Sequence, residues 1–519
     1  MYLEFVRRIR GSIHGSIDVT HIEDLVIAHP YFQRLRRVRQ TAFLNFVFPG
    51  ASHSRFEHSL GVMHLAGSAW RKIRDNQERL FHSTKRYKDF SARELSQSPG
   101  GGVHGILSPT FDLARNVFSS NYVFQCLRLA GLMHDLGHPP FSHSGERFLP
   151  DVDSILMDNS DLPKYLVAHL EELKEKADGK KRWRVVSHET FTILMIWKIL
   201  TEVNKDLLND QKPNTQLMTV DPRDVISIIN PSISPKLNSE LHQYQVSKLC
   251  HQIVSGEVDI DRMDYLTRDS KESGVVYGIF DGDRILDSLG VYYNQADNNL
   301  HLAIQFSGLA AFEDYLRARQ SMYLQLYFHK TSVAAEAMMQ YIVANLKGWR
   351  LPAKIEEYCK VDEYNIAPIL ISSAEGLIED TSKLRYIKTV INDLVFDRKL
   401  WKRVFEISGS SNAIQSDSTL EKAEAILSEL GVHYEKISSA NSLTKFRMRK
   451  SNQMSENYLR LIKKDSRQFP RVFPIEDFSN LFKTQTSVHI CRLYIDPRAS
   501  ENVVSKVKEK LIEELDDYS

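Results

Sequence analysis

Hydrophobic residues recur at spacings of three and four along most of this chain, and that spacing marks the buried face of an α-helix. The segments with the helical pattern are 31–40, 54–75, 121–136, 187–202, 262–269, 311–346 and 501–517. Runs that resemble strands are fewer and shorter, at 275–280, 290–293, 300–304 and 488–495. Because a polar, Asn-rich stretch separates 290–293 from 300–304, these two runs predict a β-hairpin. The pattern as a whole predicts a mainly α-helical protein with short β-hairpins.

Polar segments suggest how the chain is divided. Residues 83–108 are polar and contain a Ser-Pro-Gly-Gly-Gly run, and residues 171–184 are densely charged. Both are typical of surface insertions between packed elements. Helical patterns dominate before residue 347, and helices and strands mix after it. We therefore expect a helical domain over residues 1–347 and a mixed α/β C-terminal lobe over residues 348–519.

Composition narrows the class of protein. The 519 residues include 67 basic and 66 acidic ones, a formal net charge of +1, so no overall field attracts nucleic acid or a membrane. The four cysteines lie far apart and predict no disulfide framework, which fits a reducing compartment. The N-terminus has no apolar signal core, and no run approaches about 18 apolar residues. We expect a cytoplasmic protein without a membrane span, in which any anion site is local.

A His-Asp pair stands out as candidate chemistry. His134 and Asp135 lie at the C-terminal end of an apolar predicted helix, which Gly137 and two prolines then stop. Polar residues in that position can face a cleft while their neighbours anchor in the core. Imidazole and carboxylate together suit Fe, Mn, Zn or Mg with a bound water. Chance alone produces roughly one such pair in a chain of this composition, so the pair needs partners.

Two further residues are candidates for the same centre. His58 lies near the start of the helix predicted over 54–75, and Asp261 opens the one over 262–269. Asp261, Tyr265 and Asp269 are four residues apart, so they share one helical face. Taken singly, His58 is more often a structural histidine, and Asp261 can be a helix N-cap. Taken with the His-Asp pair, they predict a metal centre.

A second helical face carries residues that suit a nucleotide. Arg319, Tyr323 and Tyr327 are spaced by four, and Lys330 follows by three. No Gly-rich phosphate loop occurs in the sequence, so side chains such as these would have to bind phosphates. The alternative for the two tyrosines is packing in the helix core, the commoner fate of aromatic residues at this spacing.

Several segments resemble the HD-domain deoxynucleoside triphosphate triphosphohydrolases, a dGTPase-like family. The segments are 31–40, 47–61, 131–143, 187–189, 259–265 and 319–330. The Phe-Pro-Gly-Ala-Ser-His run with the Arg-Phe-Glu-His that follows it is the most specific of them. The resemblance covers roughly the first two thirds of the chain. It implies an HD-domain helical core and the reaction of a dNTP with water to a deoxynucleoside and inorganic triphosphate.

The resemblance also implies a role for each site residue. One divalent ion (Fe, Mn, Mg or Zn) would be bound by four ligands, and a second Mg would accompany the triphosphate. The implied metal ligands are His58, His134, Asp135 and Asp261. The implied catalytic residues are His143, His138, His188, Arg55 and Glu146. His143 is expected to protonate the departing 5′ oxygen, because histidine can carry a proton near neutral pH. The alternative for His138 and His143 is hydrogen bonding within their loop.

The implied substrate residues bind the triphosphate and the sugar. They are Gln40, Arg262, Tyr265, Asp269, Arg319, Tyr323, Tyr327 and Lys330. Arg319 would bind phosphate, Asp269 would accept from the 3′ hydroxyl, and Tyr327 would crowd the 2′ position and exclude ribonucleotides. The arginines at 34, 36, 37 and 39 could form a solvated face, but the resemblance places Arg34 and Arg36 at an allosteric nucleotide site between subunits. Gly11-Ser12 departs from the family pattern near that site, which puts the identity of the activator in doubt.

The resemblance extends to assembly and regulation. It implies a homo-oligomer (a dimer, tetramer or larger), a dNTP or GTP effector, and a regulatory role in oligomerisation for the C-terminal lobe. Weak binding of single-stranded nucleic acid and a part in antiviral defence or in dNTP pool control are further expectations. Two alternatives stay open. One is an HD phosphodiesterase or nucleotidase that acts on another nucleotide, and the other is a nucleotide or nucleic-acid sensor with a vestigial metal site.

Overall fold

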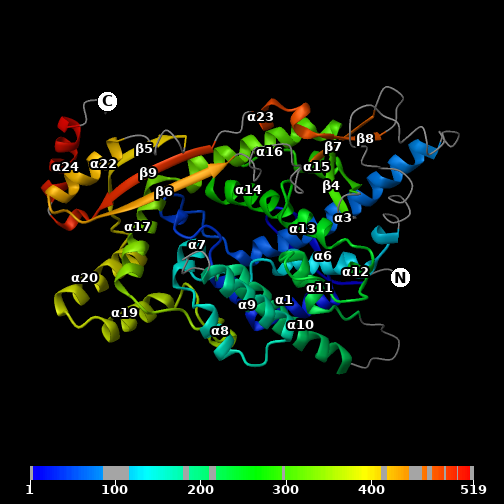
Figure 1. The fold of residues 1–519 in the computed structure, drawn as a ribbon, viewed down its shortest axis with the longest axis horizontal. Helices are drawn as coiled ribbons and strands as arrows, with labels where there is room; N and C mark the ends of the chain where they lie inside the picture. Colours follow the sequence, from blue (N-terminus) through cyan, green and yellow to red (C-terminus); the bar gives the residue numbers. More distant parts are fainter. Residues whose placement is uncertain are drawn as a thin grey trace.

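The structure is a computed structural model that describes residues 4–85, 116–178, 186–209, 218–294, 299–410, 418–442, 459–464, 470–483, 487–499 and 501–514 (Figure 1). Helices dominate and the sheets are small, which confirms the predicted mainly α-helical fold with short hairpins. Most of the insertion predicted at 83–108 lies outside the described residues. In the one predicted at 171–184, residues 171–178 instead belong to helix α9 (Lys164–Asp178), and only 179–184 lie outside the described residues. Within the described ranges, every helix is too short or too polar to cross a bilayer.

A group of packed helices forms the centre of the fold. The group consists of α3 (Arg55–Lys85), α6 (Asn121–Met133), α10 (His188–Asn209), α11 (Pro222–Ile229), α13 (Ser247–Ser255) and α14 (Ile260–Ser273). Helix α6 packs on α3 and α11, and α14 packs on α3 and α13. Every residue of α6 from Val123 to Met133 is buried, because the helix is apolar nearly all round. Its N-cap Ser120 accepts from the backbone N–H of Val123.

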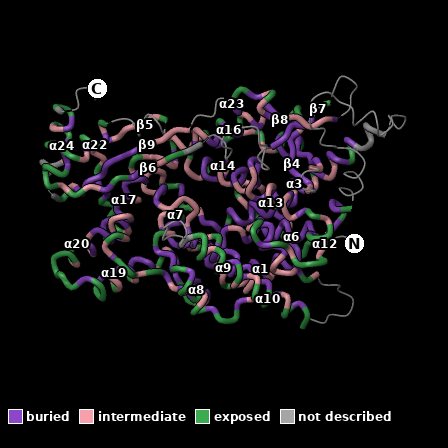
Figure 2. Tube along the Cα trace, in the orientation of Figure 1, coloured by how far each residue is buried: buried purple, intermediate pink, exposed green. Residues whose placement is uncertain are grey.

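Shorter helices surround this group. They are α1 (His21–Ala28), α2 (Pro30–Gln33), α7 (Ser142–Gly145), α8 (Val152–Asp158), α9 (Lys164–Asp178), α12 (Glu240–Gln243), α15 (Gly282–Leu286), α16 (Leu309–Met322), α17 (Lys330–Asn345), α18 (Ile355–Tyr358), α19 (Ile366–Leu377), α20 (Thr381–Asn392), α22 (Thr419–Glu429), α23 (Asn480–Lys483) and α24 (Glu501–Glu514). Figure 2 shows buried residues gathered around α6 and α13, and exposed residues along α19, α20 and α24.

Three small sheets complete the described fold. The strands β1 (Phe5–Gly11) and β2 (Gly15–Thr20) form an antiparallel hairpin that the hydrophobic pattern did not predict. A four-stranded sheet has the order β3 (Leu289–Asn294), β4 (Asn299–Gln305), β7 (Arg460–Lys464), β8 (Pro470–Pro474). Its antiparallel β3–β4 pair is the hairpin that the pattern predicted. A three-stranded antiparallel sheet has the order β5 (Lys402–Gly409), β9 (Ser487–Ile495), β6 (Tyr434–Ser442).

The strand predicted at 275–280 is wrong. Helix α14 ends at Ser273, Gly274 caps its C-terminus with a φ of 72°, and an irregular loop follows. Val276 and Ile279 are 74% and 67% exposed, so the apolar run does not pack in a sheet. The absence of a side chain at Gly278 lets the loop lie close against α14. A Cβ there would be 2.1 Å from the carbonyl oxygen of Leu266.

Two of the predicted helices are shorter than the pattern suggested. Segment 31–40 contains only α2 and a 3₁₀ turn, η1 (Arg34–Arg37). Segment 311–346 is broken into α16, a π-helical turn η5 (Tyr323–Tyr327) and α17. The break depends on β9, where Arg492 donates to the carbonyl oxygen of Phe328 at 2.6 Å and the Tyr494 hydroxyl donates to that of Lys330 at 2.8 Å. Neither glycine nor proline marks the break in the sequence.

One buried core extends past residue 347. Leu351, Tyr358, Trp401 and Tyr494 belong to the same cluster of buried residues as the helices α3 and α6. A smaller cluster lies between the three-stranded sheet and the helices α22 and α24. The division of the chain at 347 stays a prediction.

Glu336 lies on α17, and its ionisation can be used to test how this helix packs on α7. Burial raises the pKa of Glu336 to about 7, against smaller opposing effects of Arg147, His143 and Arg492. The folded protein therefore holds this proton more firmly than the unfolded chain does. The stabilisation is complete at a pH below the pKa that Glu336 has in the unfolded chain. It is lost as the pH rises through the pKa that Glu336 has in the folded protein.

Glutamine cannot ionise, so Glu336→Gln is expected to escape the ~2–3 kcal/mol of unfolding free energy that the wild type loses as the pH rises. Urea unfolding at about pH 5 and about pH 8 would measure it, and wild type should lose more stability between the two than the variant. Equal losses in both proteins would contradict the assignment.

Candidate functional site

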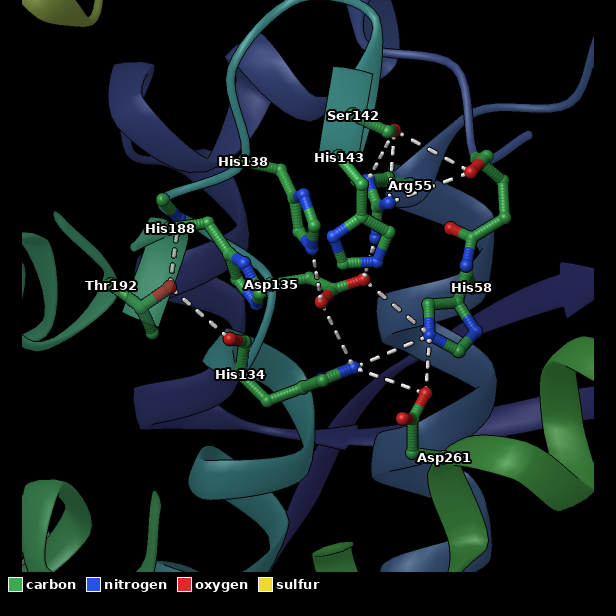
Figure 3. Close-up of polar contacts among 12 residues, drawn as sticks. Arg55, His58, His134, Asp135, His138, Ser142, His143, His188, Thr192 and Asp261 are labelled. Carbon is green, nitrogen blue, oxygen red and sulfur yellow. Dashed lines mark hydrogen bonds and ion pairs between the residues drawn. The ribbon is translucent and has the colours of Figure 1, made fainter. Parts of the chain in front are cut away.

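The four predicted metal ligands converge, although they come from distant parts of the chain (Figure 3). His58 lies on α3, His134 and Asp135 follow the last turn of α6, and Asp261 lies in the first turn of α14. The Nε2 atom of His58 is 3.0 Å from Asp261 Oδ1 and 3.2 Å from Nε2 of His134. Nε2 of His134 is 3.4 Å from both Asp135 Oδ1 and Asp261 Oδ1.

The donor set fits a divalent cation. The Nδ1 atoms of the two histidines are already engaged, that of His58 by Asp264 Oδ2 at 2.8 Å and that of His134 by the carbonyl oxygen of Gly131 at 2.9 Å. In the neutral tautomers that donate from Nδ1, both Nε2 lone pairs point toward one another. A cation between them removes this repulsion, and bonds of about 2.1 Å place neighbouring ligand atoms roughly 3 Å apart. His58, His134 and Asp135 have donor atoms close enough together to share one ion.

The charges around this centre favour ionised carboxylates. Burial alone would raise the pKa of Asp261, but the neighbouring His134 and His58 hold it below its usual value. Burial is likewise outweighed at Asp135, whose pKa is held well below its usual value by Arg55 and His134. Deprotonated carboxylates are what metal binding requires.

The alternative role of Asp261 as a helix cap is wrong. Helix α14 begins at Ile260, and its N-cap is Asp259, whose side chain accepts from the backbone N–H of Arg262 at 2.9 Å. The carboxylate of Asp261 therefore faces the histidines instead of the helix end.

Asp264 supports the centre and was missed by the sequence analysis. It is fully buried, and its carboxylate contacts His58 Nδ1, Nε2 of His14 at 2.6 Å, and Arg268 Nε and Nη2 at 2.8 and 2.9 Å. Gly61 makes room for it, because a Cβ there would lie 1.9 Å from Asp264 Oδ1. The four-residue spacing from Asp264 to Arg268 was a visible signal, but the contact with His14 depends on where the β1–β2 hairpin packs.

The predicted catalytic histidines form a second cluster beside the first. His138 lies 3.3 Å from Asp135 Oδ1 through its Nε2, and its ring stacks on His188 with centroids 3.7 Å apart. Glu146 Oε1 joins the other two histidines, at 3.0 Å from His143 Nδ1 and 2.5 Å from His188 Nδ1. Burial would raise the pKa of Glu146, but these two hydrogen bonds hold it below its usual value. Burial, assisted by Arg55 and His188, lowers the pKa of His138, which stays neutral.

Arg55 connects the two clusters. Its guanidinium pairs with Asp135, and it donates from Nη2 to Ser142 Oγ at 2.9 Å and to the carbonyl oxygen of Gln40 at 3.4 Å. Phe141 and Ser142 have φ values of 63° and 51°, a left-handed conformation that such residues rarely adopt. The His143 side chain that follows them is 73% exposed, so a substrate can reach it.

The two helical faces predicted to bind substrate meet beside the metal ligands. Asp269 Oδ2 accepts from the Tyr327 hydroxyl at 2.7 Å, and Asp269 Oδ1 lies 2.7 Å from Nε2 of His53. The ring centroid of Tyr265 lies 6.3 Å from that of Tyr327 and 6.4 Å from that of His58. The Tyr265 ring thus contacts both the metal ligands and the tyrosine face of η5.

Other predicted substrate residues lie at the edges of this face. The Arg319 guanidinium is 5.7 Å from the ring centroid of Tyr323, whose ring contacts Tyr327. Lys330 is the first residue of α17. Arg262 instead donates to the carbonyl oxygen of Gly256 at 3.0 Å and pairs with Asp259. Gln40 Oε1 is buried and has no hydrogen-bond partner within the described part of the chain.

The two predicted allosteric arginines differ in exposure. Arg34 is completely buried, and it donates to the carbonyl oxygens of Val361 and His138, each at 2.9 Å. Its guanidinium is therefore not available to an effector in this conformation, contrary to the prediction. Arg36 is exposed, donates to Gln33 Oε1, and lies 3.5 Å above the ring centroid of Phe56.

The helical core gathers two histidines and two aspartates from α3, the end of α6 and α14, a donor set that could hold a divalent ion. A family model described as the HD associated region matches residues 280–468. The deoxynucleoside triphosphate triphosphohydrolase SAMHD1 of Homo sapiens is 26% identical over 443 residues, 83% of this chain and 54% of SAMHD1. The uncharacterized protein YwfO of Bacillus subtilis is 30% identical over 338 residues, 64% of this chain and 54% of YwfO.

Other proteins are similar to this chain in sequence or in fold. An uncharacterized protein of Methanocaldococcus jannaschii is 25% identical over 390 residues, 75% of this chain and 60% of that protein. The chain thus spans 54% to 60% of the length of these three relatives. A hypothetical protein from Aquifex aeolicus has a TM-score of 0.59 at 22% identity, covering 97% of this chain and 99% of that one. A phosphohydrolase structure from Bacteroides thetaiotaomicron has a TM-score of 0.55 at 21% identity, covering 94% and 99%.

These comparisons show that the chain is similar to HD-domain proteins, among them the dNTP triphosphohydrolase SAMHD1. The sequence similarity rests on the aligned relatives, and the two solved structures support the fold alone.

Asp264 provides a test of the metal centre that does not require activity. Asp264→Asn removes the charge that orients His58 and is expected to weaken divalent metal binding about 10- to 100-fold. Calorimetric titration of the metal-free protein with Mn²⁺ or Zn²⁺ would measure this change. Asp287→Asn, which alters an exposed carboxylate paired with Lys72, is the matched control. An unchanged affinity in Asp264→Asn would show that Asp264 does not support the ligand.

Proposed function

We propose that this protein is a metal-dependent dNTP triphosphohydrolase, which converts a dNTP and water to a deoxynucleoside and inorganic triphosphate. One observation supports this most directly. The predicted metal ligands lie beside His138, His143 and His188, joined to them at Asp135 (Figure 3). Glu146 holds His143 and His188. The relatives named as dNTP triphosphohydrolases support the choice of substrate.

Each cluster has its own task in the proposed reaction. A divalent ion (Fe, Mn, Mg or Zn) held by His58, His134, Asp135 and Asp261 would polarise a phosphate oxygen and supply an activated water. His143 donates a proton to the departing 5′ oxygen from Nε2, because its Nδ1 is engaged by Glu146. The same carboxylate oxygen of Glu146 holds His188, so the two histidines keep a fixed relation.

Arg55 is proposed to bind the phosphate, and the neutral His138 to support the residues beside it. The planar guanidinium of Arg55 suits two phosphate oxygens, and it already lies beside Asp135 at the edge of the metal centre. His138 packs between Asp135 and His188, where it keeps both in place without adding a charge.

The sugar is proposed to lie against the Asp269–Tyr327 pair. Asp269 accepts from the 3′ hydroxyl, and Tyr327 occupies the space that a 2′ hydroxyl needs. Tyr265 packs on the sugar, while Arg319, Tyr323 and Lys330 continue the wall toward the triphosphate. A triphosphate carries about four negative charges, so a second Mg²⁺ on the substrate completes the neutralisation. Gln40 has a buried Oε1 that a sugar hydroxyl could satisfy, whereas a contribution of Arg262 requires its side chain to leave Gly256 and Asp259.

Assembly and regulation stay predictions. These are homo-oligomers of two, four or more copies, a dNTP or GTP effector near Arg36, weak single-stranded nucleic-acid binding, a cytoplasmic location and a part in antiviral defence.

Phosphorus NMR decides between the proposed function and its alternatives. The protein loaded with Mn²⁺ or Fe²⁺ should release inorganic triphosphate from at least one dNTP, with and without GTP. His134→Ala should lower kcat by about 10³-fold or more, because it removes a metal ligand. His242→Ala, at an exposed histidine on α12, is the matched control.

Other outcomes of this experiment would support one of the two alternative functions. Pyrophosphate or monophosphate without triphosphate would indicate the phosphodiesterase or nucleotidase alternative. Nucleotide binding that is unaffected by His134→Ala, without any product, would indicate a sensor.

Tyr327 tests how the proposed enzyme rejects ribonucleotides. Tyr327→Ala opens the space beside Asp269 and is expected to lower the ratio of kcat/KM for a dNTP over its NTP about tenfold or more. Steady-state kinetics on matched dNTP and NTP pairs would measure the ratio. A ratio that does not change would remove Tyr327 from the sugar site, whereas release of triphosphate would remain a separate result.

A further inference from the structure

A segment that follows the helical core wraps the loop carrying the predicted catalytic groups. We call residues 351–363 the strap and residues 137–148 the catalytic loop. The backbone N–H of Leu351 donates to the carbonyl oxygen of Phe148 at 2.7 Å, and the Tyr358 hydroxyl donates to that of Gly137 at 2.6 Å. The strap thus holds the catalytic loop at both of its ends, although more than 200 residues separate them in the sequence.

Arg34 joins the strap to the middle of the loop. Its Nη1 donates to the carbonyl oxygen of His138 and its Nε to that of Val361, each at 2.9 Å. Its guanidinium also lies 5.0 Å from the ring centroid of Tyr358. Because Arg34 is completely buried, these contacts are its environment in the folded protein, and they connect a predicted catalytic residue to the strap.

Glu363 holds the strained part of the loop. Its Oε1 accepts from the backbone N–H groups of Phe141 at 3.3 Å and Arg39 at 3.0 Å. Phe141 and Ser142 both have left-handed backbone conformations, which persist only where the surroundings impose them. His143 follows directly, so the direction of its side chain depends on this strained turn.

The strap itself is firmly anchored. The Tyr358 ring stacks on Phe191 of α10 with centroids 3.9 Å apart. The side chain of Asn159 donates to the carbonyl oxygen of Ala353 and accepts from the backbone N–H of Ile355, at 3.0 and 3.1 Å. Asp362 pairs with Arg37. The strap can therefore act as a rigid support against which the loop is set.

We propose that the strap is the positioning element of the catalytic loop. Tyr358 and Glu363 of the strap are positioning residues, and so is Arg34 of η1, which joins the strap to the loop. They hold backbone atoms at 137, 138 and 141, and the catalytic side chains projecting from the loop are aligned as a result. This inference rests on the proposed function for its kinetic test, but its structural test does not. Arg34 is then an internal support for His138 instead of an effector ligand.

Tyr358→Phe is the sharpest variant, because it removes one hydroxyl and keeps the stack on Phe191. It is expected to lower kcat about tenfold, while KM for the dNTP changes less than about twofold, because small displacements of catalytic groups are costly. Hydrogen exchange should become faster at residues 137–148 and stay unchanged in α13. Tyr386→Phe removes a hydroxyl bonded to Asp496, away from the loop, and is expected to change neither measurement.

Glu363 and Arg34 extend the test. Glu363→Ala should behave like Tyr358→Phe, whereas Glu363→Gln keeps an oxygen acceptor and should restore most of kcat. Arg34→Gln should lower kcat in a way that saturating GTP or dNTP does not restore. Restoration by nucleotide would assign Arg34 to the effector site and overturn its role here.

The structural and kinetic outcomes are separable. If Tyr358→Phe and Glu363→Ala keep kcat within about twofold of wild type and leave loop exchange unchanged, the strap supports only stability and the proposal fails. If the wild type releases no triphosphate, the proposed function fails, and faster exchange at residues 137–148 in these variants still supports the strap.

Discussion

The carboxylate of Asp264 meets three donor side chains in the middle of the core, and much of the site is arranged around it. A buried charge is costly unless it is paired and hydrogen-bonded. Asp264 is paired with His58 from α3, His14 from the β1–β2 hairpin and Arg268 from its own helix. The absence of a side chain at Gly61 lets the carboxylate come this close. One interaction thus orients a predicted metal ligand and also ties the N-terminal hairpin to the helix that carries Asp261.

The same requirement for pairing continues outward from the metal centre. Asp135 is paired with Arg55, and Arg55 donates to Ser142 in the strained turn before His143. That turn is held in place from the other side by Glu363. The chemistry of the site therefore depends on contacts that extend from α3 to a segment beyond residue 347, and the buried core extends equally far. Separating the chain at that point would remove part of the support of the catalytic loop.

The proposed substrate face depends on the C-terminal part of the chain in a different way. A continuous helix over 311–346 was expected, but the structure has a π-helical turn at Tyr323–Tyr327 and a break after it. Arg492 and Tyr494 of β9 bond to the carbonyl oxygens at this break. A π-helical turn changes the direction of the side chains that follow, and such turns are frequent at functional sites. The position of Tyr327 against Asp269 is accordingly a product of packing, not of helical spacing alone.

The sequence by itself determined the features that depend on local periodicity: the helices around 54–75, 121–136 and 262–269, the hairpin of β3 and β4, and the set of residues able to form a metal centre. These follow because the spacing of apolar residues decides which face of an element is buried. Only the tertiary structure decided which faces meet. It paired His14 with Asp264, buried Arg34 against His138, broke the helix at Phe328 and left 275–280 without a sheet. Such contacts join residues up to hundreds of positions apart, and local spacing carries no information about which distant partner will satisfy a buried polar group.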